Sequence, residues 1–306
     1  MSPLESATST EPTKLDIGSS YDGTTATYRL LRTFNWGPLL MNLGYYPFRG
    51  PLRPLNWFTD LSLSQRRLVG KSIARLDLRP GHDVLDVACG RGMSTFMIHQ
   101  RAGSGRVVGV DFLPENIRAA HTLFAGYSNL SYRQGDAGNL DFADASFDRI
   151  HCLEAAFHFP DKPQFLRECR RVLRPGGRLV LVDIVWRTTA SRREADPRRT
   201  DIIKQIWQFH DLFSGDEYKA AAEDAGLLLA AERDWTNQVT EPLLSLFGHA
   251  VWLAKRPWGR KLIEAYNPQA KSLSDSDWRD LEISADAHRE QRKHGKYMAY
   301  EFIVPR

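Results

Sequence analysis

The stretch "VLDVACGRG", residues 84–92, places a run of small residues directly after a short apolar segment. Glycines in such a position indicate that something approaches the main chain closely, because a larger side chain would block it. A nucleotide or a phosphate would satisfy this pattern, and a tight turn alone is the alternative. We therefore treat Gly90 and Gly92 as candidate ligand-binding positions.

Around this loop, short apolar runs alternate with helical patterns. Strands that are apolar throughout and are separated by helices are typical of a parallel sheet covered on both faces. The sequence therefore predicts a doubly wound α/β core over residues 64–186, with Ser64 as the N-cap of the helix that leads into it. The apolar runs are "HDVLDVA" (82–88), "RVVGVDF" (106–112), "FDRIHCLEA" (147–155) and "RLVLVDIV" (178–185).

The flanking segments have other patterns. Residues 1–20 predict a disordered leader, because they have neither the basic nor the apolar region of a signal peptide. Residues 21–63 predict an N-terminal helical lid of short helices broken by glycines and prolines. Residues 187–306 predict a helical cap inserted before the last strand, "YMAYEFIVP", together with the last strands of the sheet.

Composition excludes several classes of partner. The net charge of +4 over 306 residues is small, so we expect no nucleic-acid binding, and the basic stretch "SRREADPRRT" (191–200) is interpreted as a solvated loop. No apolar run is long enough for stable membrane insertion. Cys89, Cys152 and Cys169 are odd in number, which favours reduced thiols in a cytoplasmic protein, and no metal-binding spacing is present.

Two carboxylates narrow the choice of ligand for the glycine loop. Asp111 ends the next apolar run, and an acid at the tip of the second strand can accept hydrogen bonds from both hydroxyls of a ribose. Asp86 stands at the entrance of the loop, where it would repel a pyrophosphate. It could instead reach the cationic amino-acid end of S-adenosylmethionine, directly or through water. A nicotinamide dinucleotide is therefore disfavoured.

Further motifs follow in order, among them "YRQGDAGN" (132–139) and "RVLRPGG" (171–177). Over residues 65–186 the sequence resembles the class I S-adenosylmethionine-dependent methyltransferases. The resemblance implies a seven-stranded Rossmann-like sheet with S-adenosylmethionine as cofactor. It also implies a set of cofactor-binding residues in addition to Asp86: the loop residues Ala88, Gly90 and Gly92, the ribose acid Asp111, the ring of Phe112, the adenine corner Asp136 and Ala137, and Leu153 at the end of the fourth strand. Ala88 stands where the family often has glycine.

The segment "MNLGYYP" (41–47) looks like the N-terminal lid that closes over the cofactor in many relatives, which would add Tyr45 to the cofactor-binding residues. Packing of this tyrosine into the core is the alternative.

Methyl transfer needs the acceptor, methyl group and sulfur held in line, and a base only if the acceptor must lose a proton. Glu154 and His158 follow the fourth strand and Asp183 ends the fifth, so we expect all three at one mouth of the site. The stretch around them resembles small-molecule O-methyltransferases, but has Phe157 where those proteins have the first histidine of a pair. For O-methylation, which we favour, His158 would be the base, supported by Asp183 or Glu154.

The same stretch also resembles sterol C-methyltransferases, in which Glu154 would take the leading role on an alkene. Many aromatic residues fall in the predicted cap, which favours a hydrophobic small-molecule substrate such as a lipid, polyketide or terpenoid of secondary metabolism. A non-catalytic binding protein with the methyltransferase fold is the distant alternative, and a homodimer remains an option.

Overall fold

The structure, a computed structural model, describes residues 40–48, 51–52, 55–56, 59–103, 105–209, 211–266 and 268–306. The predicted leader (1–20) and most of the predicted lid (21–63) lie outside the described residues.

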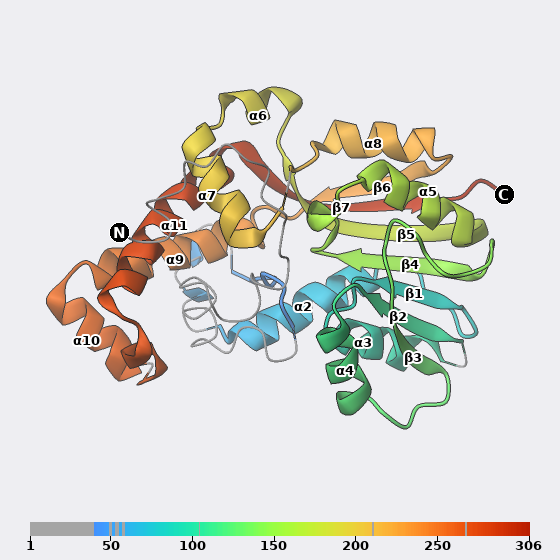
Figure 1. The fold of residues 1–306 in the computed structure, drawn as a ribbon, viewed down its shortest axis with the longest axis horizontal. Coiled ribbons are helices and arrows are strands. Elements are labelled where there is room, and N and C mark those ends of the chain that lie inside the picture. The colour runs from blue at the N-terminus through green and yellow to red at the C-terminus, as the bar shows by residue number, and fades with distance from the viewer. Residues whose placement is uncertain are drawn as a thin grey trace.

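A seven-stranded sheet forms the centre of the protein (Figure 1). Strands β1 to β5 pair in parallel, whereas β7 is antiparallel to both of its neighbours, β5 and β6. The strand order β3-β2-β1-β4-β5-β7-β6 confirms the predicted Rossmann-like, doubly wound α/β fold. The strands are β1 (Val84–Val87), β2 (Val107–Asp111), β3 (Leu130–Gln134), β4 (Phe147–Leu153), β5 (Leu173–Trp186), β6 (Leu228–Asp234) and β7 (Gly295–Ile303).

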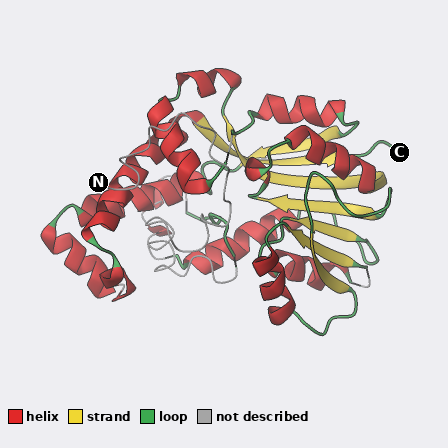
Figure 2. Ribbon diagram, viewed as in Figure 1, coloured by secondary structure: helices red, strands yellow, loops and turns green. Residues whose placement is uncertain are grey.

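Helices cover both faces of the sheet (Figure 2), which explains why the central strands are apolar on both sides. On one face α5 (Lys162–Val172) and α8 (Gly215–Asp224) bury Phe165 and Tyr218 against the strands. On the other, α2 (Leu61–Ile73), α3 (Met93–Ala102) and α4 (Pro114–Leu123) bury Leu68, Ile98 and Ile117. The carboxyl ends of the five parallel strands meet at one edge, beside the cap.

The predicted helical cap before the last strand is confirmed, and it gathers at one end of the molecule (Figure 1). Its helices are α6 (Thr189–Glu194), α7 (Pro197–Trp207), α9 (Thr240–Ala254), α10 (Pro257–Tyr266), η4 (Pro268–Ser272) and α11 (Asp275–His294). The short η3 (Ala156–His158) follows β4. Within the described residues, none of the helices combines the length and apolar character needed to cross a membrane.

Two local predictions were wrong. Ser64 is not an N-cap: α2 begins at Leu61, and the Asp60 side chain accepts the hydrogen bond from the Leu63 N–H. Residues 191–200 are not a loop, because all of them except Ala195 and Asp196 lie in α6 or α7, and Arg199 pairs with Glu290 of α11. Within the predicted lid, residues 40–48 contain no helix, whereas residues 51–52 and 55–56 form short helical turns.

Candidate active site

The glycine loop between β1 and α3 turns sharply, with left-handed backbone at Ala88 (φ 56°), Gly90 (φ 55°) and Gly92 (φ 87°). A Cβ on Gly92 would lie 2.7 Å from Cε1 of Tyr132, so this glycine is required by the close packing of the chain's own core. At Gly90 the only neighbour of such a Cβ within 4 Å, among the residues that the structure describes, is Cε of Met41 at 3.1 Å. Gly90 is therefore the position in this loop at which a ligand can approach the backbone.

Asp111, at the end of β2, lies directly against this loop. Its Oδ2 accepts a hydrogen bond from the Gly90 N–H (2.8 Å), and its Oδ1 accepts from the Leu113 N–H and from Asn116 Nδ2, both at 3.0 Å. Asp111 is only 7% exposed, and this burial raises the pKa of its carboxyl. A carboxylate offers about four acceptor sites, so it retains capacity for a ribose hydroxyl.

The next residue, Phe112, is 60% exposed, which is high for an aromatic side chain. An exposed apolar ring beside a fixed carboxylate suits the flat base and the sugar of a nucleoside. The role of Phe112 in stacking on adenine remains a prediction.

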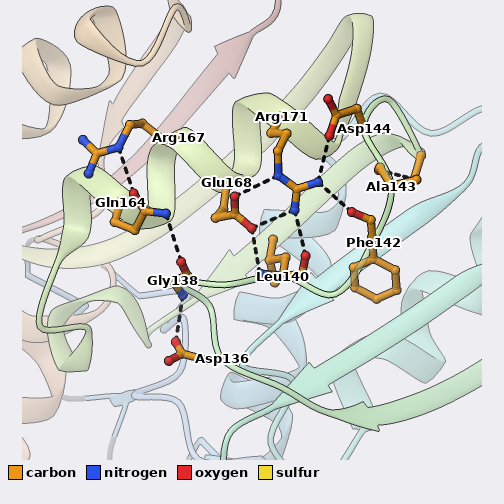
Figure 3. A network of polar contacts seen from close by, with 11 residues as sticks. Asp136, Gly138, Leu140, Phe142, Ala143, Asp144, Gln164, Arg167, Glu168 and Arg171 are labelled. Carbon is orange, nitrogen blue, oxygen red and sulfur yellow. Dashed lines mark hydrogen bonds and ion pairs between the residues drawn. The ribbon is translucent and has the colours of Figure 1, made fainter.

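The adenine corner follows β3 (Figure 3). Asp136 is exposed, and its Oδ1 accepts a hydrogen bond from the Gly138 N–H at 2.8 Å. The Gln164 side chain of α5 donates a hydrogen bond to the Gly138 carbonyl at 3.1 Å. Ala137 is buried in the core on the face of the sheet that α5 covers. The backbone of the corner is thus held in place by α5.

A second pair of α5 side chains braces the same loop further on (Figure 3). Glu168 accepts a hydrogen bond from the Leu140 N–H (2.7 Å), while Arg171 donates to the carbonyls of Leu140 (2.7 Å) and Phe142 (2.6 Å). The hydrogen bonds from Arg171 hold the pKa of Glu168 below its usual value. These contacts pre-organise the loop without any help from a ligand.

Asp86 is more deeply buried than the sequence suggests, with 1% of the residue exposed. Its Oδ2 accepts hydrogen bonds from the hydroxyls of Ser94 (2.6 Å) and Thr95 (2.7 Å) on α3, and its Oδ1 lies 2.7 Å from Nδ1 of His151. Because only 1% of the residue is exposed, its carboxylate is not accessible to direct contact with a ligand. The predicted contact of Asp86 with the cofactor therefore stays a prediction only in its indirect form, through water.

His151, in the middle of β4, is a buried partner of Asp86 that the sequence reasoning missed. Its Nε2 lies 2.8 Å from the hydroxyl of Ser72, whose own proton is donated to the Val69 carbonyl. The His151 ring therefore links the carboxylate of Asp86 to the hydroxyl of Ser72 in a buried chain of polar contacts. The signal was a histidine within an otherwise apolar strand, "FDRIHCL".

Glu154 follows β4 in a left-handed conformation (φ 51°). Both of its carboxylate oxygens accept from the Leu43 N–H, at 3.1 and 3.0 Å, and Oε1 also accepts from the hydroxyl of Tyr297 on β7. Burial raises the pKa of Glu154 to about 8, although the two hydrogen bonds oppose this shift. Tyr297 was not predicted, because 143 residues separate it from Glu154 in the sequence.

Glu154 lines an apolar pocket between the sheet edge and the cap. The walls come from the strand ends, from the cap helices and from residues 41 and 43. Met41 lines this pocket and is also the side chain nearest to Gly90, so the pocket adjoins the glycine loop. The lining residues are Met41, Leu43, Glu154, Phe157, Ile184, Trp207, Phe209, Leu212, Thr240, Leu243, Leu244, Phe247, His288 and Gln291.

Of the three groups expected at one mouth, Glu154 is the one that lines this pocket. His158 is buried beside the ring of Phe157, and its Nδ1 lies 3.0 Å from the Gln208 carbonyl. Burial lowers the pKa of His158 to about 4. Asp183 is fully buried and accepts a hydrogen bond from the Tyr218 hydroxyl (2.7 Å), and burial raises the pKa of Asp183 to about 7. His158 and Asp183 are not among the residues that line this pocket, and their catalytic roles stay predictions.

Two further predicted cofactor residues lie in apolar surroundings. The Tyr45 ring packs edge-on against Trp235, with centroids 5.9 Å apart, and the Lys71 ammonium lies 5.7 Å from the Tyr45 centroid. Leu153 is half-buried and packs against the core on the α2 side of the sheet. Within the described residues, no group of three or more His, Cys, Asp or Glu side chains is arranged to hold a metal ion.

Comparison with known proteins places this architecture in a family. A methyltransferase domain matches residues 85–181. The methyltransferase GfsG of Streptomyces halstedii is 31% identical over 261 residues, covering 80% of this chain and 88% of that protein. The chain belongs to the S-adenosylmethionine-dependent methyltransferases.

Two other similar proteins extend the comparison. The 27-O-demethylrifamycin SV methyltransferase of Amycolatopsis mediterranei is 30% identical over 76% of this chain and 80% of its own. The solved structure of a geranyl diphosphate methyltransferase in complex with its cofactor shares the fold, with a TM-score of 0.64, 18% identity, and 87% of this chain and 99% of that chain covered. S-adenosylmethionine is the cofactor of the protein described here, as it is for its family.

Proposed function

We propose that this methyltransferase transfers the methyl group to a hydroxyl of a largely hydrophobic small molecule, a lipid, polyketide or terpenoid of secondary metabolism. The observation that carries the proposal is the apolar pocket around Glu154, which adjoins the glycine loop through Met41. A pocket with aromatic walls and one carboxylate suits an apolar acceptor with a single reacting group. The similarity to an enzyme named for O-demethylrifamycin supports O-methylation.

The residues that would hold the cofactor are Gly90, Asp111, Phe112, Asp136 and Ala137. When bound, S-adenosylmethionine supplies an electrophilic methyl group on a sulfonium. The chain's contribution is to fix the carboxylate of Asp111 and the backbone of the adenine corner before binding, and to keep water out of the acceptor pocket.

Glu154 would act as the base. As the acceptor oxygen receives the methyl group, the hydroxyl proton would move to the Glu154 carboxylate, and the cofactor would leave as a neutral thioether. Because its pKa is about 8, the Glu154 carboxyl holds its proton near neutral pH. The positive sulfonium of a bound cofactor would favour the ionised form of this carboxyl. His158, whose pKa is about 4, would be a weaker base and has its Nδ1 at a backbone carbonyl.

C-methylation of an alkene is the second candidate. The rings of Phe157, Trp207 and Phe209 share the pocket with Glu154, and aromatic faces together with a carboxylate stabilise a developing carbocation.

One labelling experiment separates the two. The protein is incubated with cofactor that carries a ¹³C-methyl group and with a panel of macrolides, sterols and prenyl alcohols, and the product is examined by NMR. Label on oxygen supports the O-methyltransferase, and label on carbon supports the second candidate. Cofactor binding without transfer to any hydrophobic compound would contradict both.

The setting of the reaction is also part of the proposal. We place the protein in the cytoplasm, which is supported by its three buried cysteines, all of them free thiols. The partner is the small-molecule acceptor, without nucleic acid, and a homodimer stays an option.

A further inference from the structure

The acceptor pocket has a neighbour on the surface of the cap. This outer groove lies along α9 and α11 and has a volume of about 510 Å³. Leu244, Phe247 and His288 line both the groove and the inner pocket around Glu154, so a single layer of side chains separates the two. The outer groove is lined by Leu244, Ser245, Phe247, Gly248, His249, Trp252, Ala285, His288, Arg289 and Arg292.

The inner pocket as it stands cannot hold a hydrophobic acceptor. Its free volume is about 60 Å³, whereas ligand pockets usually reach roughly 300–1,000 Å³. One of its walls must therefore move before the acceptor can reach Glu154.

The wall on the side of the N-terminal segment is held by hydrogen bonds. The Leu43 N–H donates to Glu154, and Gln65 of α2 donates to the carbonyls of Leu40 (3.0 Å) and Asn42 (2.8 Å). Opening this side breaks contacts of partly buried polar groups, each of which costs free energy.

The wall on the side of the cap combines one fixed and one movable ring. His288 is fixed, because its Nε2 accepts from the Trp207 indole N–H (2.9 Å) and its Nδ1 donates to the Ser284 carbonyl (2.7 Å). The half-buried ring of Phe247 meets the His288 ring edge-on, with centroids 6.0 Å apart. A phenyl ring has no hydrogen bond to break, so Phe247 can change rotamer at lower cost than either His288 or the N-terminal segment.

We propose that the acceptor reaches Glu154 through the groove between α9 and α11. The Phe247 side chain opens this route by changing rotamer, while the ring of His288 stays in place. This inference rests on the proposed function, and it also specifies the shape of the acceptor molecule. The acceptor is elongated, with an apolar reacting end in the inner pocket. Its polar far end stays in the groove beside Ser245, His249 and Arg289.

Gly248 offers a sharp test, because it lies in the groove and a Cβ on it would meet no atom of the described residues within 4 Å. Gly248→Trp is designed to place an indole in the groove. The matched control is Gly70→Trp on α2, a second helical glycine whose Cβ would likewise meet no described atom within 4 Å. Gly248→Ala controls for the loss of glycine itself.

The probe is 1-anilinonaphthalene-8-sulfonate, an apolar molecule with one polar end. The measured signal is the decrease in its fluorescence when added farnesol displaces it from the protein. We expect Gly248→Trp to weaken this binding at least about tenfold, which corresponds to about 1.4 kcal/mol. Gly70→Trp and Gly248→Ala should bind the probe as the unsubstituted protein does. All variants should keep their affinity for S-adenosylhomocysteine, measured by calorimetry.

Unchanged displaceable binding in Gly248→Trp would overturn the route and place access on the side of the N-terminal segment. If Gly248→Trp fails to fold, Ser245→Cys labelled with pyrene maleimide after folding fills the same groove, with labelled Ala230→Cys on β6 as control. The three native cysteines are buried, so the introduced thiol is the one labelled. Failure of the proposed function would appear separately, as absence of methyl transfer by the unsubstituted protein.

Discussion

The cofactor edge of the sheet and the acceptor pocket under the cap are built in opposite ways. At the cofactor edge, polar groups close in sequence hold one another, as Asp111 does with Gly90, Leu113 and Asn116. The acceptor pocket is apolar, and its one carboxylate is held by Leu43 and Tyr297, which are 111 and 143 residues away. The first region is built to bind one fixed ligand, whereas the second depends on how distant elements pack.

The largest effect that this comparison predicts is at Glu154. Glu154→Gln keeps the shape of the pocket but removes the base, so kcat should fall about 10²- to 10⁴-fold. Affinity for S-adenosylhomocysteine should change by less than about threefold, because Glu154 belongs to the acceptor side. The matched comparison is His158→Ala, and a greater loss of kcat in that variant would return the role of base to His158.

A pH profile sharpens the same contrast. The pKa of Glu154 is raised to about 8, so the active carboxylate is depleted below that pH, and kcat/KM should rise about tenfold per pH unit before levelling near pH 8. Tyr297→Phe removes a hydrogen bond that lowers this pKa, so the rising limb should move to higher pH. A base with the pKa of His158, about 4, would instead give a profile that is flat above pH 5.

At the cofactor edge, Asp111→Asn should weaken binding of S-adenosylhomocysteine. Hydrogen bonds to a charged group contribute about 1.5–3 kcal/mol, so we expect a loss of roughly 10- to 100-fold by calorimetry. The exposed Asp136, changed to Asn, should lose less. Binding of the hydrophobic probe should be unaffected in both variants. Weaker probe binding would contradict the separation of the two regions.

The smallest effect concerns the glycine that serves packing. Gly92→Ala forces a Cβ to within 2.7 Å of Tyr132 and strains a left-handed backbone, so the free energy of unfolding should fall by about 1–3 kcal/mol. Gly70→Ala, in the middle of α2 with open space around its Cβ, should raise it by about 0.5–1 kcal/mol. Urea denaturation measures both. Equal stability of the two variants would show that Gly92 is not limited by the core.

Sequence reasoning identified the fold and the cofactor edge because both depend on local patterns. Apolar runs that alternate with helices dictate a covered parallel sheet, and the residues at strand ends must meet at one edge. The placement of Asp111 beside Gly90 follows from this rule. Asp111 ends β2 and Gly90 lies in the loop that follows the neighbouring β1, and backbone pairing sets the register of these two strands.

The sequence by itself therefore determined the strand-end chemistry, the small residues of the loop and the insertion of the cap before β7. Tertiary structure alone decided that Glu154 lines the pocket, that Asp183 is fully buried, and that His151 is the buried partner of Asp86. The physical reason is that burial, and hence the direction of each pKa shift, depends on contacts between residues far apart in the chain. No local pattern records those contacts.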